Sequence, residues 1–200
     1  AAMKVRLESR RAMTEQQVVD EAVERVKQIH RVAVTPESLF LVTNMESGHG
    51  FAIWRCSLDL SERERVVSDL AGCCGQMDIQ AVADRIVIAE NSRHRVRVVG
   101  LDGEPVAQFG ETSRTDVTKG FGGCCNPMNT CASSDGSLLT SESNGLVKRY
   151  GADGTFLEVV GVADVQAGCK NSSIGMSADG GTLYYLDVHE GRIVVLERAG

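Results

Sequence analysis

Short stretches in which apolar and polar residues alternate recur along most of the chain. Residues 85–90 read RIVIAE, residues 95–100 read RVRVVG and residues 105–110 read PVAQFG, and such short runs are typical of β-strands. Asp-Gly dipeptides stand between the runs, where tight turns need residues that tolerate a positive φ. The pattern therefore predicts many strands joined by tight turns, with Asp-Gly pairs that begin at Asp102, Asp135, Asp153 and Asp179.

The strand pattern belongs to a repeated unit. Copies align from Asp78, Asn129 and Ser173, and a weaker copy starts at His30. Periods of about 40–50 residues with four short strands each indicate the blades of a β-propeller. We therefore predict an all-β propeller of about four blades within residues 30–200, with units at about 30–70, 71–122, 123–167 and 168–200.

The repeats resemble those of the NHL-repeat propeller family. The segments DIQAVADRIVIAENSRHRVRVVGLDGEPVAQFG and GSLLTSESNGLVKRYGADGTFLEVVG carry this resemblance, and GFGGCCNPMN is similar to an uncharacterised bacterial subfamily with a Cys-Cys-Asn-Pro loop. The resemblance covers residues 70–200 well and residues 30–70 weakly. NHL propellers usually have five or six blades, whereas four units are found here. The resemblance implies a fold and not a chemistry, because propellers host enzymes, scaffolds and binding modules alike.

Residues 1–29 form a separate N-terminal region. Within TEQQVVDEAVERVKQI, from Thr14, the apolar residues follow helical spacing, and Gln17 three residues after Thr14 fits a capping box. We expect an amphipathic helix that covers a face or an edge of the ring, or that binds a partner. The segment MKVRLE, residues 3–8, is a candidate fourth strand for the last blade, which would close the ring. The alternative is an open arc that closes as a homodimer.

Charge and hydropathy narrow the classes of partner. The net charge of −6 argues against nucleic acid, whose phosphates are neutralised by basic patches. No run of about 18 apolar residues is present, so we expect no membrane span. A protein partner is expected instead. The compartment stays open, although a processed end at Ala1-Ala2 would favour an extracytoplasmic location.

Five of the seven cysteines occupy one recurring place in the repeat. They stand just ahead of the first strand of a unit, in GCCGQMDI, GGCCNPMNT and AGCKNSSI. Equivalent positions of consecutive blades meet around one axis, so the fold should gather these thiols at one mouth of the channel. The five residues are Cys73, Cys74, Cys124, Cys125 and Cys169, and Cys131 lies close by on an inner strand.

Thiolates bind soft metal ions and iron–sulfur clusters, and a four-iron cluster needs about four of them. We predict Cys74, Cys125, Cys131 and Cys169 as ligands, with Cys73 and Cys124 as substitutes. The leading hypothesis is thus a propeller that binds a metal or an iron–sulfur centre and acts in electron transfer or as a subunit of a larger assembly. Zinc is the alternative metal.

Two other interpretations stay open. In the first, the cysteines form structural disulfides in a metal-free interaction propeller. In the second, the protein is a zinc-dependent hydrolase or lyase that uses His30 and Asp78. NHL-like amidating lyases hold zinc with inner-strand histidines, but His30 alone stands at such a place here. No other catalytic signature is found, which favours a non-enzymatic role, and Cys56 is expected to be a packing residue.

An acid ends the second strand of three units, and a base lies in the third strand. These pairs are expected to be structural ion pairs between neighbouring strands. They are Glu90 with Arg95, Glu142 with Lys148, and Asp187 with Arg192.

Overall fold

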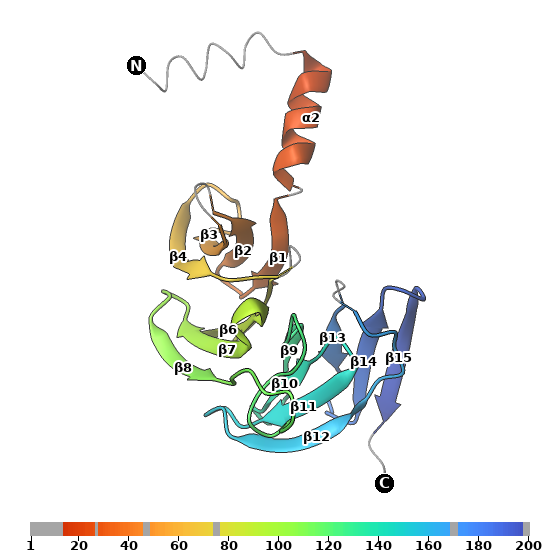
Figure 1. Ribbon diagram of the computed structural model, residues 1–200. Helices are drawn as coiled ribbons and strands as arrows, with labels where there is room; N and C mark the ends of the chain where they lie inside the picture. The colour runs from red at the N-terminus through yellow and green to blue at the C-terminus, as the bar shows by residue number, and fades with distance from the viewer. Residues whose placement is uncertain (1–13, 27, 46–48, 74–76, 169–171, 198–200) are drawn as a thin grey trace.

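Almost all regular structure in the chain is β-strand, arranged as four consecutive antiparallel sheets (Figure 1). The computed structural model describes residues 14–26, 28–45, 49–73, 77–168 and 172–197. Blade 1 consists of β1 (Ile29–Val34), β2 (Leu39–Asn44), β3 (Phe51–Cys56) and β4 (Arg63–Leu70). Blade 2 consists of β5 (Asp78–Val82), β6 (Arg85–Glu90), β7 (Arg95–Gly100) and β8 (Pro105–Phe109), with a 3-10 turn, η1 (Asn91–Arg93), after β6. Blade 3 consists of β9 (Asn129–Ala132), β10 (Leu138–Ser141), β11 (Leu146–Tyr150) and β12 (Phe156–Val162), and blade 4 of β13 (Ile174–Met176), β14 (Thr182–Asp187) and β15 (Arg192–Glu197).

Within each sheet the strands are hydrogen-bonded in the order of the sequence, so every blade is a meander. The first strands of consecutive blades, β1, β5, β9 and β13, contact one another and form the inner wall of the arc. The blades follow one another around this wall in Figure 1. This arrangement confirms the predicted four-bladed propeller with an N-terminal helix.

The hydrophobic core lies between the blades, and strand β6 shows why. Successive side chains of a strand point to opposite faces of its sheet. Ile86 and Ile88 pack into the core shared with blade 1, whereas Val87 packs into the core shared with blade 3. Both faces of blade 2 are therefore covered, and burial of each such side chain contributes about 1.5–3 kcal/mol. A third core cluster joins blades 3 and 4.

The outward face of blade 4 is uncovered within the described residues. Two pairs of neighbouring apolar side chains on β14 and β15, Tyr184 with Val195 and Leu186 with Ile193, are exposed there. Blade 4 has three strands in the described part of the chain, and β15 is its edge. Residues 3–8, which were predicted to close the ring by adding a fourth strand, lie outside the described residues.

Helix α2 (Glu15–Val26) precedes blade 1. Its predicted capping box is confirmed, because the Gln17 N–H donates to Thr14 Oγ1 (3.3 Å) and the Thr14 N–H donates to Gln17 Oε1 (2.9 Å). The expectation that the helix covers the ring is wrong. Figure 1 shows it standing away from the blades, and Val18, Val19 and Val23 are each about half exposed. No helix in the described ranges is long and apolar enough to cross a membrane.

Candidate functional site

Three cysteine thiols from two blades meet at one end of the inner wall. The Sγ atoms of Cys73, Cys124 and Cys125 all lie within 4.8 Å of one another. Those of Cys125 and Cys73 are 2.7 Å apart. Cys125 is buried, Cys73 is half-buried and Cys124 is exposed, so the group is open to solvent on one side. We call these three residues the thiol group.

The thiol group is carried by the segments that run into the first strands of blades 2 and 3. We call the described part of such a segment the leading loop of its blade: residues 71–73 and 77 for blade 2, 110–128 for blade 3, and 163–168 with 172–173 for blade 4. Cys73 lies in the leading loop of blade 2, and Cys124 and Cys125 lie in that of blade 3. The propeller fold thus brings together thiols that are about 50 residues apart, as the sequence predicted for this place in the repeat.

The remaining predicted ligands fall into two classes. Cys74 and Cys169 lie outside the described residues. Cys131, on β9, is placed away from the thiol group and packs in the core between blades 3 and 4 with Leu139 and Leu183. Burial raises the pKa of the Cys131 thiol, which disfavours the thiolate that would bind a metal. Cys56 is buried at the end of β3, in agreement with its expected packing role.

The leading loop of blade 2 is anchored by the end of strand β6. The Ala71 N–H donates to Glu90 Oε1 (2.9 Å), and the Cys73 N–H donates to Asn91 Oδ1 (2.8 Å). Arg93 Nη1 donates to the Asp69 carbonyl (2.9 Å) and also pairs with Glu90 (2.7 Å). The backbone beside Cys73 is therefore bound to buried side chains of its own blade.

The leading loop of blade 3 is anchored in the same way through Asn126. Its Oδ1 accepts the Ser143 N–H (2.7 Å), and its Nδ2 donates to the Gly122 carbonyl (2.6 Å) and to Glu142 Oε2 (3.4 Å). The peptide bond between Asn126 and Pro127 is cis. The side chain of Asn126 thus ties the Gly-rich turn that contains both cysteines to the end of strand β10.

A buried cation holds the other end of this turn. Lys148 Nζ lies 2.7 Å from Glu142 Oε1 and donates to the carbonyls of Gly120 (2.5 Å) and Val117 (3.3 Å). It also sits 4.2 Å from the centre of the Phe121 ring. Burial lowers the pKa of Lys148, and the pairing with Glu142 opposes that shift.

The three acid–base pairs predicted as structural are confirmed: Glu90 with Arg95, Glu142 with Lys148 at 2.7 Å, and Asp187 with Arg192 at 3.3 Å. Sequence reasoning missed their second contact. In blades 2, 3 and 4 a nearby base donates to a carbonyl in the leading loop or just before it, Arg93 to Asp69, Lys148 to Gly120 and Arg192 to Asp164. The regular recurrence of an acid at the end of the second strand was the signal that could have revealed it.

The inner strands carry a second set of polar contacts. Arg31 Nε lies 2.6 Å from Asp78 Oδ1 and Arg31 Nη2 donates to the Ser172 carbonyl (3.1 Å), while Asp78 Oδ2 accepts the Thr130 N–H (2.9 Å). His30 packs its ring edge-on against Phe51. Asp78 therefore binds Arg31, and neither His30 nor Asp78 joins the potential ligand group found among the described residues. This geometry gives no support to a zinc enzyme built on the pair.

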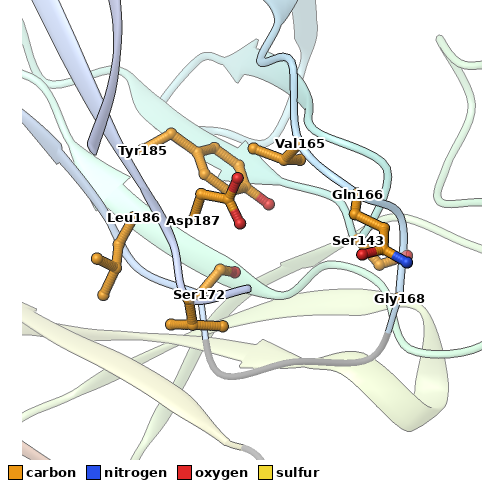
Figure 2. A pocket seen from close by; sticks show the side chains of 9 residues that line it. Ser143, Val165, Gln166, Gly168, Ser172, Tyr185, Leu186 and Asp187 are labelled. Atoms are coloured by element: carbon orange, nitrogen blue, oxygen red, sulfur yellow. The ribbon is translucent and has the colours of Figure 1, made fainter. Parts of the chain in front are cut away.

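A polar pocket lies at the leading loop of blade 4. Figure 2 shows Asp187 and Tyr185 from β14 facing Ser143 and Gln166 across it. The Tyr185 hydroxyl donates to the Glu142 carbonyl (3.1 Å) and so links blade 4 to the anchor of blade 3. Asp187 accepts the N–H groups of His189 (3.1 Å) and Glu190 (3.3 Å), so its carboxylate is already engaged.

Comparison with known proteins supports the fold and no closer relationship. No family profile matches the chain, and no curated protein sequence matches it either. The NHL resemblance therefore stays a prediction.

Several solved structures share the arrangement of blades. The chain is similar to a structure of a nidogen/laminin complex, with 18% identity, a TM-score of 0.58, and coverage of 85% of this chain and 65% of that one. It is similar to hydrazine synthase of Kuenenia stuttgartiensis, with 12% identity, a TM-score of 0.55, and coverage of 84% and 58%. Virginiamycin B lyase from Staphylococcus aureus gives 15% identity, a TM-score of 0.53, and coverage of 84% and 51%.

The chain spans less than two thirds of each of these structures. At such low identities the likeness concerns the fold alone. The functional argument therefore rests on the thiol group.

Proposed function

We propose that this propeller binds one soft metal ion through Cys73, Cys124 and Cys125. The observation that carries the proposal is the convergence of three Sγ atoms within 4.8 Å, from two separate loops. Cysteine thiolates are preferred ligands of zinc and copper(I). The protein would act as a binding module, with its metal site at one mouth of the arc of blades.

The spacing of the thiols favours a single ion over a cluster. Around a tetrahedral zinc with Zn–S bonds of about 2.3 Å, neighbouring sulfurs lie about 3.8 Å apart. A four-iron cluster binds each thiolate to a different iron, so its ligand sulfurs must stand further apart. Three sulfurs within 4.8 Å therefore suit one zinc or copper(I) ion better than a cluster, once Cys73 and Cys125 move apart by about 1 Å from their 2.7 Å spacing. The iron–sulfur and electron-transfer hypothesis takes second place.

Elemental analysis of reduced, anaerobically purified protein tests the proposal. We expect about one zinc or copper per chain without acid-labile sulfide, and loss of that metal in Cys125→Ser. Cys56→Ser is the matched control, because Cys56 is a buried cysteine of β3 outside the thiol group. Iron with stoichiometric labile sulfide, or a reduced protein that holds no metal at all, would overturn the proposal.

A second candidate function follows from the short distance between Cys73 and Cys125. Their sulfurs, 2.7 Å apart, are close enough for a disulfide to form with little movement of the two loops. The protein would then be a metal-free interaction propeller with its blades 2 and 3 cross-linked. Alkylation before and after reduction, followed by mass spectrometry of peptides, tests this: a linked Cys73–Cys125 peptide in freshly isolated protein supports it, and two alkylated free thiols contradict it.

A further inference from the structure

We infer that the anchors of blades 2 and 3, which are Glu90 and the Lys148–Glu142 pair together with the neighbouring Asn91 and Asn126, are positioning residues for the thiol group. They act through the two leading loops, whose backbone groups they bind. The inference rests on the proposed metal site, and it explains why two loops from different blades present their sulfurs at one point.

In blade 3 the anchor binds both ends of a short turn. Lys148 holds the Gly120 carbonyl at the start, and Asn126, bound to Glu142 and to the Ser143 N–H, holds the end. Cys124 and Cys125 lie between these two points. Because Lys148 and Glu142 form one ion pair, both ends of the turn are tied to a single buried unit.

In blade 2 the anchor binds the loop beside its cysteine. Glu90 accepts the Ala71 N–H, and Asn91 accepts the N–H of Cys73 itself. Glu90 is fully buried and is held in turn by Arg93 and Arg95. The same structural device therefore fixes the backbone on each side of the thiol group, once from each blade.

Positioning of this kind matters for metal affinity for two reasons. A loop that is already ordered loses less conformational entropy when it binds an ion. Thiolates held close together repel each other until an ion joins them, so a loosely held pair would separate. Partners that orient metal ligands typically change metal affinity about 10- to 100-fold when they are removed.

Substitution of Asn126 is the sharpest test, because it removes the loop contact and leaves the ion pair between Lys148 and Glu142 in place. We expect Asn126→Ala to bind Co²⁺, used as a spectroscopic substitute for zinc, about 10- to 100-fold more weakly than the unchanged protein. The d–d bands of the bound Co²⁺ should also change, because the geometry of the sulfur ligands changes. Asn91→Ala should act in the same direction from blade 2.

Glu158→Gln is the matched control. Glu158 pairs with Arg149 on the same blade (3.2 Å), but the pair is far more exposed than Lys148 with Glu142. A merely structural role for Asn126 would lower the melting temperature and leave the affinity and the Co²⁺ bands of the folded protein unchanged. Affinity within twofold of the unchanged protein, with an unaltered spectrum, would overturn the inference.

A metal-free measurement separates this inference from the proposed function. Oxidised glutathione can cross-link Cys73 to Cys125 by two successive thiol–disulfide exchanges, each of which releases one glutathione thiolate. We expect the cross-link to form several-fold more slowly in Asn126→Ala than in Glu158→Gln. If the unchanged protein binds no Co²⁺ but the cross-linking rates differ in this way, the metal proposal fails and the positioning role stands. Equal cross-linking rates would contradict the positioning role with or without a metal.

Discussion

Blades 3 and 4 each contain an ion pair between a carboxylate at the end of the second strand and a base in the third strand, and the two pairs differ in how deeply they are buried. In blade 3, Lys148 is fully buried and lies 2.7 Å from Glu142. In blade 4, the side chain of Arg192 is 52% exposed and lies 3.3 Å from Asp187. Both bases also donate to a carbonyl of their leading loop, Lys148 to Gly120 and Arg192 to Asp164.

The difference in exposure follows from the residues that cover each ion pair. In blade 3, Phe121 of the leading loop covers the pair, with its ring centre 4.2 Å from Lys148 Nζ, and the Tyr185 hydroxyl of blade 4 donates to the Glu142 carbonyl (3.1 Å). The described residues place nothing comparable over the outward face of blade 4, where Tyr184 and Ile193 are exposed. The ion pair of blade 3 is therefore expected to be the stronger one, because charges interact more strongly when the surrounding residues exclude water from them.

The largest expected effect is that of Lys148→Met. Removal of the cation leaves Glu142 buried without its partner, which typically costs about 3–5 kcal/mol in the free energy of unfolding. Urea denaturation measures the change. The double variant Lys148→Met, Glu142→Gln should recover part of the loss, and no recovery would mean that the packing of Lys148 matters more than its charge.

The next largest effect concerns the hydrogen bond from blade 4 to Glu142. Tyr185→Phe removes one hydrogen bond from blade 4 to the anchor of blade 3 and keeps the aromatic ring. We expect a loss of about 1 kcal/mol in the free energy of unfolding. A destabilisation as large as that of Lys148→Met would contradict the hydrogen-bond argument.

Arg192→Met should cost several-fold less than Lys148→Met, although it removes the same kind of partner. Ion pairs that are exposed to solvent contribute little, because water and salt screen them. The loss should also shrink further in high salt. Equal losses for the two variants would show that burial does not decide the strength of the ion pair.

The smallest losses in the free energy of unfolding are expected at the tight turns, where the Asp side chains are exposed to solvent. Hydrogen bonds from Ser137 lower the pKa of Asp135 in blade 3, and bonds from Ser177 and Gly181 lower that of Asp179 in blade 4. Both carboxylates titrate below their ordinary value of 3.8 when folded, so their stabilisation is present above pH 3.8 and is lost as the pH falls through the lower folded pKa.

We therefore expect Asp135→Asn and Asp179→Asn to cause small and similar losses at pH 6 that shrink as the pH falls below 3.8. Urea midpoints measured at several pH values check this. A larger effect in blade 3 than in blade 4 would show that cover influences the turns as well as the anchors.

The strands of the blades and the gathering of thiols could be predicted from local patterns. Alternation in segments such as residues 85–90 identified strands, and the shared place of the cysteine pairs ahead of Asp78 and Asn129 predicted that thiols of the two loops meet, as Cys73 and Cys125 do. The misplaced ligand was Cys131, since its inner-strand position did not reveal whether its side chain faces the channel or the neighbouring blade. Only the packing against Leu183 decides that.

The anchoring of the loops was beyond the sequence for a different reason. The Asn91 side chain binds the backbone N–H of Cys73, 18 residues away, and the Asn126 side chain binds that of Ser143, 17 residues away. No local sequence pattern encodes such contacts. The helix was predicted correctly from the spacing of its apolar residues. Its position was not predicted, because an apolar face of a helix does not identify the surface against which it packs.

X-ray absorption spectroscopy of the metal in reduced, zinc-loaded protein tests the central claim most directly. The account predicts a first shell with three sulfur ligands at about 2.3 Å in the unchanged protein and in Cys56→Ser, and fewer sulfurs in Cys125→Ser. A shell made of nitrogen and oxygen alone, or one that Cys125→Ser leaves unchanged, would contradict the account.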